Sequence, residues 1–114
     1  MLIIRKEQIE ILEKAMVTQF EDKMIDYLSH FHSDSFESKN NQEKRLLIQD
    51  EIEKAKTYGI ETEWDICRFI QLSVVYNSDR EKKKEMVENI LEDKNLTGTS
   101  KINAIFKNLE INPE

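Results

Sequence analysis

The sequence contains few of the residues that usually interrupt regular secondary structure. Its 114 residues include two glycines and one proline, whereas charged residues make up 35%. Sandwiches and barrels of β-strands need many turns built from glycine, asparagine and proline, so this composition argues against an all-β fold. No apolar run approaches the roughly 20 residues that a membrane-spanning helix needs. We therefore expect a helical protein that does not enter a membrane.

Cysteine occurs once, at Cys67, which excludes an internal disulfide and a zinc site built from several cysteines. Its neighbours Ile66 and Phe69 are apolar and no base lies nearby in the sequence, so we expect a buried thiol with a structural role. The lack of disulfides is compatible with the cytoplasm. The apolar start, residues 1–4, is too short for the core of a signal peptide, and we therefore expect a cytoplasmic protein.

The usual motifs of catalysis and cofactor binding are also missing. Two glycines cannot supply a glycine-rich phosphate loop, and no carboxylate lies within an apolar run where burial would raise its pKa. His30 and His32 would point in different directions on a helix. Asp26 lies one turn before His30, but no third metal ligand is suitably spaced. We expect no enzymatic activity, no cofactor and no metal.

Acidic residues outnumber basic residues by 23 to 17, which gives a formal net charge of −6. Nucleic acids select proteins with a basic surface, so this balance argues against nucleic-acid binding. The order helix, Gly59, helix does occur in helix-turn-helix proteins. Here, however, the second helix begins with Glu61, Glu63 and Asp65, which DNA phosphates would repel, and then becomes mostly apolar.

Apolar residues recur every three or four positions through most of the chain, a spacing typical of amphipathic helices. The pattern predicts an all-α fold with one compact domain over 1–114, an ordered core at about 5–110 and a flexible loop over 33–41. Thr99 or Ser100 is expected to cap the last helix. About five helices are expected, the first of them unusually long: approximately 6–32, 41–58, 62–76, 78–91 and 99–109.

Other residues mark where the middle helices begin and end. Asn40 or Asn41 can cap the second helix, and Gly59 lies where its end needs a residue with positive φ. Thr62 begins the third helix, and Asp65 follows three residues later in the pattern of a capping box. The third helix is apolar on most of its circumference, so we expect it at the centre of the domain.

Candidate protein-binding residues come from two places. The first helix presents Met16, Phe20 and Met24 on one apolar stripe, and methionine side chains adapt to varied partners. Ile60 and Trp64 lie at the start of the third helix, where the only tryptophan stands among acidic residues. Tryptophan is enriched at protein interfaces. Each of these five residues can instead belong to the core, which is the more common role for any single one of them.

Three segments of the chain have spacings that are shared with a known group of proteins. The first helix contains Gln8, Leu12 and Phe20-Glu21. The other two segments are Ala55-x-x-Tyr58-Gly59-Ile60-x-Thr62-Glu63-x-Asp65 and Ile90-Leu91-x-Asp93-x-x-Leu96-x-Gly98-x-x-Lys101. With these segments the chain resembles the small accessory proteins encoded beside type VI secretion effectors and their loading adaptors. The resemblance implies a cytoplasmic helper that binds an adaptor or an effector and has no catalytic residues.

The sequence leaves three functional hypotheses. The first is a co-adaptor or chaperone that helps to load a type VI secretion effector, through an apolar stripe aided by acidic complementarity. The alternative is an immunity protein or antitoxin that binds and inhibits a toxin, for which the net charge of −6 would suit a basic nuclease. A third possibility is a helical regulator that forms a homodimer through its long first helix.

Overall fold

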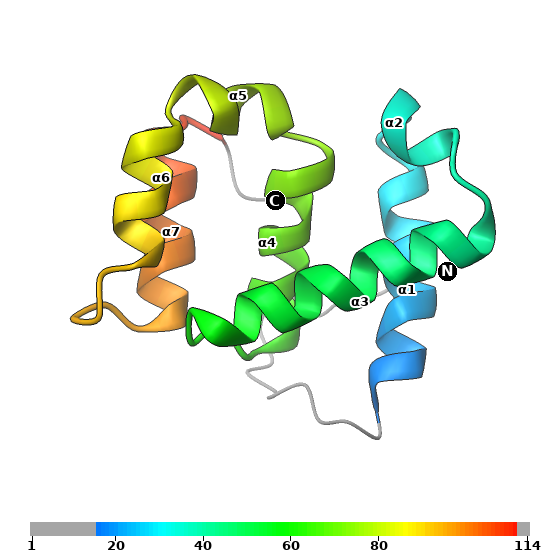
Figure 1. Cartoon of the computed structure of the whole chain (residues 1–114), viewed down its shortest axis with the longest axis horizontal. Helices are drawn as coiled ribbons and strands as arrows, with labels where there is room; N and C mark the ends of the chain where they lie inside the picture. The colour runs from blue at the N-terminus through cyan, green and yellow to red at the C-terminus, as the bar shows by residue number, and fades with distance from the viewer. Residues whose placement is uncertain (1–15, 112–114) are drawn as a thin grey trace.

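The computed structural model describes residues 16–111, which fold into seven helices and no strand. An all-α fold is therefore confirmed, although the described residues form more helices than expected. None of these seven helices combines the length and the apolar character needed to cross a membrane. They are α1 (Val17–Ser29), α2 (Asp34–Glu37), α3 (Asn41–Thr57), α4 (Glu63–Val74), α5 (Asn77–Lys82), α6 (Lys84–Leu91) and α7 (Gly98–Asn108) (Figure 1).

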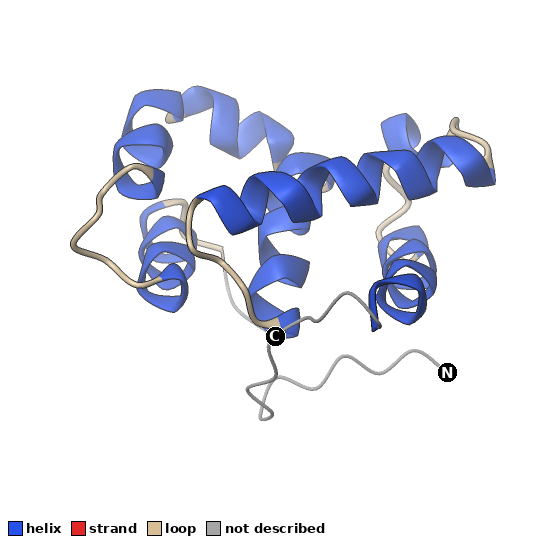
Figure 2. Cartoon of the chain, turned by 60° about the horizontal axis from the view of Figure 1, so that its bottom comes forward, coloured by secondary structure: helices blue, strands red, loops and turns tan. Residues whose placement is uncertain are grey.

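The apolar helix expected at the centre of the domain is indeed central. α4 contacts α1, α3, α5 and α7, and every residue from Asp65 to Leu72 is buried. α1 lies at one end of the molecule and the pair α6 and α7 at the other, while α3 runs lengthwise between them (Figures 1 and 2). The buried apolar side chains form one core to which every helix except α5 contributes.

Local sequence signals locate the ends of α3 correctly. Asn40 Oδ1 accepts a hydrogen bond from Glu43 N at 2.8 Å, and Glu43 Oε1 accepts one from Asn40 N at 2.9 Å, which completes a capping box. At the other end Gly59 has φ +78°. The N–H of Ile60 donates to Ala55 O at 3.0 Å, as in a Schellman motif. These ends depend on residues close in sequence, which is why they could be predicted.

The first two segments differ from expectation. The first helix was expected over 6–32, but α1 ends at Ser29, and residues 6–15 lie outside the described part of the chain. The stretch 33–41, expected to be a loop, contains α2. Phe36 on α2 is 1% exposed, and the ammonium of Lys44 lies 5.0 Å from the centre of its ring. One buried aromatic side chain thus attaches a polar stretch to the core, a contact that helical periodicity does not reveal.

The last two expected helices also have different bounds. The helix expected from about 78 to 91 is divided into α5 and α6 at Lys83, where φ is −124° and ψ is 37°. α7 begins earlier than expected. Its cap is Thr97, whose Oγ1 accepts from Ser100 N at 3.1 Å, and not Thr99 or Ser100.

Asp65 explains why Thr99 does not cap α7. Asp65 Oδ2 accepts a hydrogen bond from Thr99 Oγ1 at 2.6 Å and another from Thr62, the N-cap residue of α4, at 2.8 Å. Its Oδ1 accepts from Arg68 Nη2 at 3.0 Å. Asp65 and Arg68 are only 4% and 5% exposed. Buried charges need such partners, and here the partners join the start of α4 to the start of α7.

A second buried carboxylate joins three helices. Glu51 on α3 is 8% exposed, and its Oε1 accepts from Ser73 Oγ on α4 at 2.6 Å. Arg80 Nη1 on α5 donates to the same hydroxyl at 3.0 Å, and its guanidinium lies 5.7 Å from the ring centre of Phe69. These contacts attach α5 to α4, and through Ser73 to α3, although α5 contributes no buried residue of its own.

The two glycines meet at the contact between α7 and the turn after α3. A Cβ atom on Gly98 would lie 2.2 Å from the carbonyl oxygen of Gly59 and 2.8 Å from Ile60 Cα. Both contacts are to backbone atoms, which cannot rotate away. Beside them Lys101 Nζ donates to Tyr58 O at 2.8 Å, so that a buried ammonium binds a carbonyl at the end of α3.

We expect Gly98→Ala to lower the free energy of unfolding by about 3 kcal/mol because the added methyl group cannot fit without a backbone shift. Helix propensity alone would favour alanine at this position. The matched variant is Gly59→Ala, where φ is +78° but a Cβ meets nothing within 4 Å, and the expected loss is about 1–2 kcal/mol. Urea unfolding followed by circular dichroism measures both. An equal or smaller loss for Gly98→Ala would contradict the close contact.

We expect Asp65→Asn to cost about 3 kcal/mol, since it leaves the buried guanidinium of Arg68 without a counter-charge. The matched control is Asp79→Asn on the exposed surface of α5, where a change within about 0.5 kcal/mol is expected. Both are measured by the same unfolding experiment. Similar effects of the two substitutions would show that the Asp65 network does not hold α4 and α7 together.

Candidate functional site

The five expected protein-binding residues do not form one exposed surface. Phe20, Met24 and Ile60 are 1%, 0% and 0% exposed and belong to the core. Met16 and Trp64 are partly buried and pack against that core. The apolar stripe of α1 therefore faces inward, which is the alternative role that the sequence left open. In this conformation a partner cannot reach the three buried side chains.

Trp64 packs on a charged side chain as well as on the core. The guanidinium of Arg68 lies 5.9 Å from the centre of the Trp64 ring and 5.3 Å from that of Phe106. Arg68 Nη2 also donates to Asn103 Oδ1 at 2.8 Å, while Arg68 Nε is buried without a hydrogen-bond partner. The tryptophan thus lies beside an arginine that joins α4 to α7.

The residues considered for metal binding or nucleophilic chemistry remain separate. His30 Nδ1 lies 2.8 Å from the backbone oxygen of Asp26, and residues 16–111 contain no cluster of three side chains suited to a metal ion. Cys67 is fully buried. Burial raises the pKa of the Cys67 thiol, and the nearby carboxylate of Glu63 raises it further.

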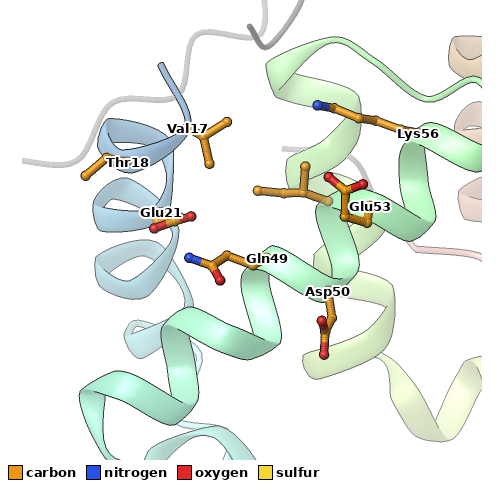
Figure 3. A pocket seen from close by; sticks show the side chains of 8 residues that line it. Val17, Thr18, Glu21, Gln49, Asp50, Glu53 and Lys56 are labelled. Atoms are coloured by element: carbon orange, nitrogen blue, oxygen red, sulfur yellow. The ribbon is translucent and has the colours of Figure 1, made fainter. Parts of the chain in front are cut away.

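A groove of about 740 Å³ lies between α1 and α3. Figure 3 shows that the side chains of Glu21 and Gln49 point toward one another across it, whereas that of Asp50 points away from it. Val17 and Ile52 are the apolar residues of the lining. The complete lining is Val17, Thr18, Glu21, Gln49, Asp50, Ile52, Glu53 and Lys56.

Glu21 is the most unusual residue of the groove because it is a carboxylate that is only 3% exposed. Its Oε1 accepts a hydrogen bond from Arg45 Nη1 at 2.8 Å, and Arg45 Nη2 donates to Asp22 Oδ1 at 2.6 Å. These hydrogen bonds, the one to Asp22 above all, raise the pKa of Arg45 above its usual value, so the guanidinium stays charged. Arg45 therefore links α1 to α3 at the groove.

The other charged residues of the groove are more exposed and lack ionic partners. Within residues 16–111, Asp50, Glu53 and Lys56 form no ion pair and no side-chain hydrogen bond. Leu46 lies on the same helix and is 52% exposed, more than any other large apolar residue in the described chain. α3 thus presents one exposed apolar side chain beside unpaired charges.

A sequence signal for this groove does exist. Gln49, Ile52, Glu53 and Lys56 are separated by three, one and three residues, which places them on one side of a helix. Polar residues with that spacing normally form a solvated face, so the pattern alone does not predict a binding site. The partner of this face, Glu21, lies on another helix, and that pairing depends on tertiary packing.

Comparisons with family models, with curated proteins and with solved structures found no match to this chain. We refer to the groove between α1 and α3 as the α1–α3 groove.

We expect Cys67 to be unreactive toward Ellman's reagent in the folded protein at pH 8. The thiolate is the nucleophile, and both the raised pKa and the complete burial of the side chain oppose its formation and its contact with the reagent. The reaction should be at least about 100-fold slower than in protein unfolded in urea. Equal rates in the folded and unfolded protein would show that the thiol is accessible.

Proposed function

We propose that this chain is a non-catalytic protein-binding domain whose contact surface is the α1–α3 groove. The observation that carries this proposal is the chemistry of the lining. Small-molecule pockets are lined mostly by apolar side chains, whereas here Val17 and Ile52 are surrounded by polar and charged residues. Such a mixture is typical of a protein interface, in which polar groups surround a small apolar centre.

The exposed side of α3 supports the same proposal. Leu46 lies three residues before Gln49 and seven before Glu53, so these side chains share one side of the helix. A partner that covered Leu46 would bury apolar surface and would at the same time reach the unpaired charges of the groove. Because the apolar stripe of α1 is in the core, we expect polar contacts to contribute more to binding than the sequence suggested.

For the partner we propose a loading adaptor or an effector of type VI secretion, which the chain would help to deliver from the cytoplasm as a co-adaptor or chaperone. This part of the proposal depends on the resemblance described above. A second candidate, favoured by the net charge of −6 and by the carboxylates of the groove, is an immunity protein that inhibits a basic toxin. The two functions differ in whether the partner is delivered or inhibited.

Site-specific photo-crosslinking in cells of the source organism tests the surface. We expect p-benzoylphenylalanine at Gln49, in the groove, to give a discrete crosslinked species that mass spectrometry can identify. The matched control places the same crosslinker at Asn89, an exposed residue of α6. Substitution of Leu46 by aspartate should then weaken the complex by at least about tenfold, as measured by isothermal titration calorimetry.

The crosslinked partner distinguishes the candidates. A secretion adaptor or effector whose delivery fails in the absence of this protein supports loading, and a toxin that is inactive while bound supports immunity. A crosslink to a second copy of this chain would replace both with a homodimer. Crosslinking from Asn89 but not from Gln49 would place the binding surface elsewhere and contradict the proposal.

A further inference from the structure

We infer that α5 is a strap that opens and closes independently of the rest of the domain, and that Arg80 is the latch that holds it closed. Opening uncovers part of the buried ring of Phe69, which Arg80 contacts. The inference is independent of the proposed function, because no residue that lines the α1–α3 groove belongs to α5. It requires that α5 be weakly attached, that its ends be fixed and that one side chain hold it closed.

α5 lacks the buried side chains that anchor the other helices. It spans six residues, Asn77–Lys82, and no side chain caps its N-terminus. Arg80 is partly buried, and the other five residues are exposed. A helix of this length is not stable by itself in water, because its few hydrogen bonds do not offset the cost of nucleation. Segments with few buried contacts open locally at a lower free energy than global unfolding requires.

Both ends of α5 are fixed to α7. On the N-terminal side the ring of Tyr76 packs edge-on against Phe106 of α7, with ring centres 6.2 Å apart. On the C-terminal side Lys83 Nζ donates a hydrogen bond to Asn108 O at 2.9 Å. The backbone departs from helical geometry at both ends, with ψ of 29° at Tyr76 and 37° at Lys83. Residues 77–82 can therefore open between two fixed points while α4 and α6 stay in place (Figure 1).

Arg80 makes the contacts that close the strap. Within residues 16–111 it is the one residue of α5 whose side chain forms a hydrogen bond or a contact with an aromatic ring. Its Nη1 donates to Ser73 Oγ at 3.0 Å, and that hydroxyl donates to Glu51 Oε1 at 2.6 Å. The hydroxyl thus connects the guanidinium to a carboxylate that is 8% exposed. These contacts are lost when α5 opens, so removal of the guanidinium favours the open state.

The side chain beneath the latch is apolar and buried. The guanidinium of Arg80 lies 5.7 Å from the centre of the Phe69 ring, and Phe69 is 1% exposed. Tyr58 packs against the same ring, with centres 6.2 Å apart, and belongs to the end of α3, which does not move with α5. The open state therefore gains one patch of aromatic surface. A ligand that binds this patch shifts the population toward the open state.

Hydrogen exchange of the whole protein, followed in ¹⁵N spectra at several urea concentrations, tests for independent opening. We expect amides 80–83 to be at least about 100-fold less protected than amides 69–72 of α4. Their exchange should also depend little on urea, because local opening exposes little surface whereas global unfolding exposes much. Equal protection and equal urea dependence in the two segments would overturn the inference.

Substitution of Arg80 tests the latch. Arg80→Met removes the guanidinium and keeps an apolar stem of similar length. We expect it to lower the protection of amides 80–83 by at least about tenfold, the effect of losing a hydrogen bond to a charged group. The matched control is Lys82→Met, at an exposed residue of the same helix. Equal effects of the two substitutions would show that Arg80 is not the latch.

A proline within α5 holds the strap open. Glu81→Pro removes an N–H of the helix and disfavours helical geometry at residue 80. We expect a folded domain whose spectral shifts are confined to α5 and the residues that it contacts. The fluorescence of 8-anilinonaphthalene-1-sulfonate, a dye that binds exposed apolar surface, should increase in its presence.

The matched control is Glu88→Pro in α6, where Val87 and Leu91 are buried and a proline should disrupt the spectrum of the whole domain. Disruption to the same extent by Glu81→Pro would show that α5 does not open independently. A folded Glu81→Pro variant that leaves the dye fluorescence unchanged would contradict the uncovering of Phe69.

Discussion

The close approach of Gly98 to Gly59 is the constraint on which the arrangement of the helices depends. α7 can begin against the turn between α3 and α4 only because Gly98 carries no side chain, since a Cβ there would meet the backbone of Gly59 and Ile60. The same approach brings Thr99 to Asp65 and Lys101 to the carbonyl of Tyr58. Three helices are therefore positioned together by one backbone contact and two buried charges, and α4 becomes the centre of the core.

Features determined by neighbours in the sequence could be predicted, and features determined by distant residues could not. The ends of α3 and the start of α4 depend on local hydrogen bonds, which leave a recognisable pattern of residue types. The start of α7 also has a local cap, Thr97, which accepts from Ser100 N, but its position was not predicted, because Thr99 instead binds Asp65 on another helix. α2 likewise depends on the burial of Phe36, which has no periodic neighbours.

The same distinction explains the candidate site. Apolar side chains at helical spacing, such as Phe20 and Met24, are found both in cores and at interfaces, so their spacing does not distinguish the two roles. The structure assigns both residues to the core. The groove instead combines polar residues of α3 with Glu21 of α1, a pairing that exists only after the two helices pack. Arg45 does not line the groove, but its guanidinium joins α3 to α1 and binds Glu21, which does line it.

The position of Trp64 has a practical consequence. As the only tryptophan, it stacks on Arg68, and Arg68 is hydrogen-bonded to residues of both α4 and α7. Its fluorescence therefore reports the junction of these two helices, whereas the residues that line the groove belong to α1 and α3. The protein thus carries an intrinsic optical signal for the separation of α7 from α4, at a position that does not take part in the proposed binding surface.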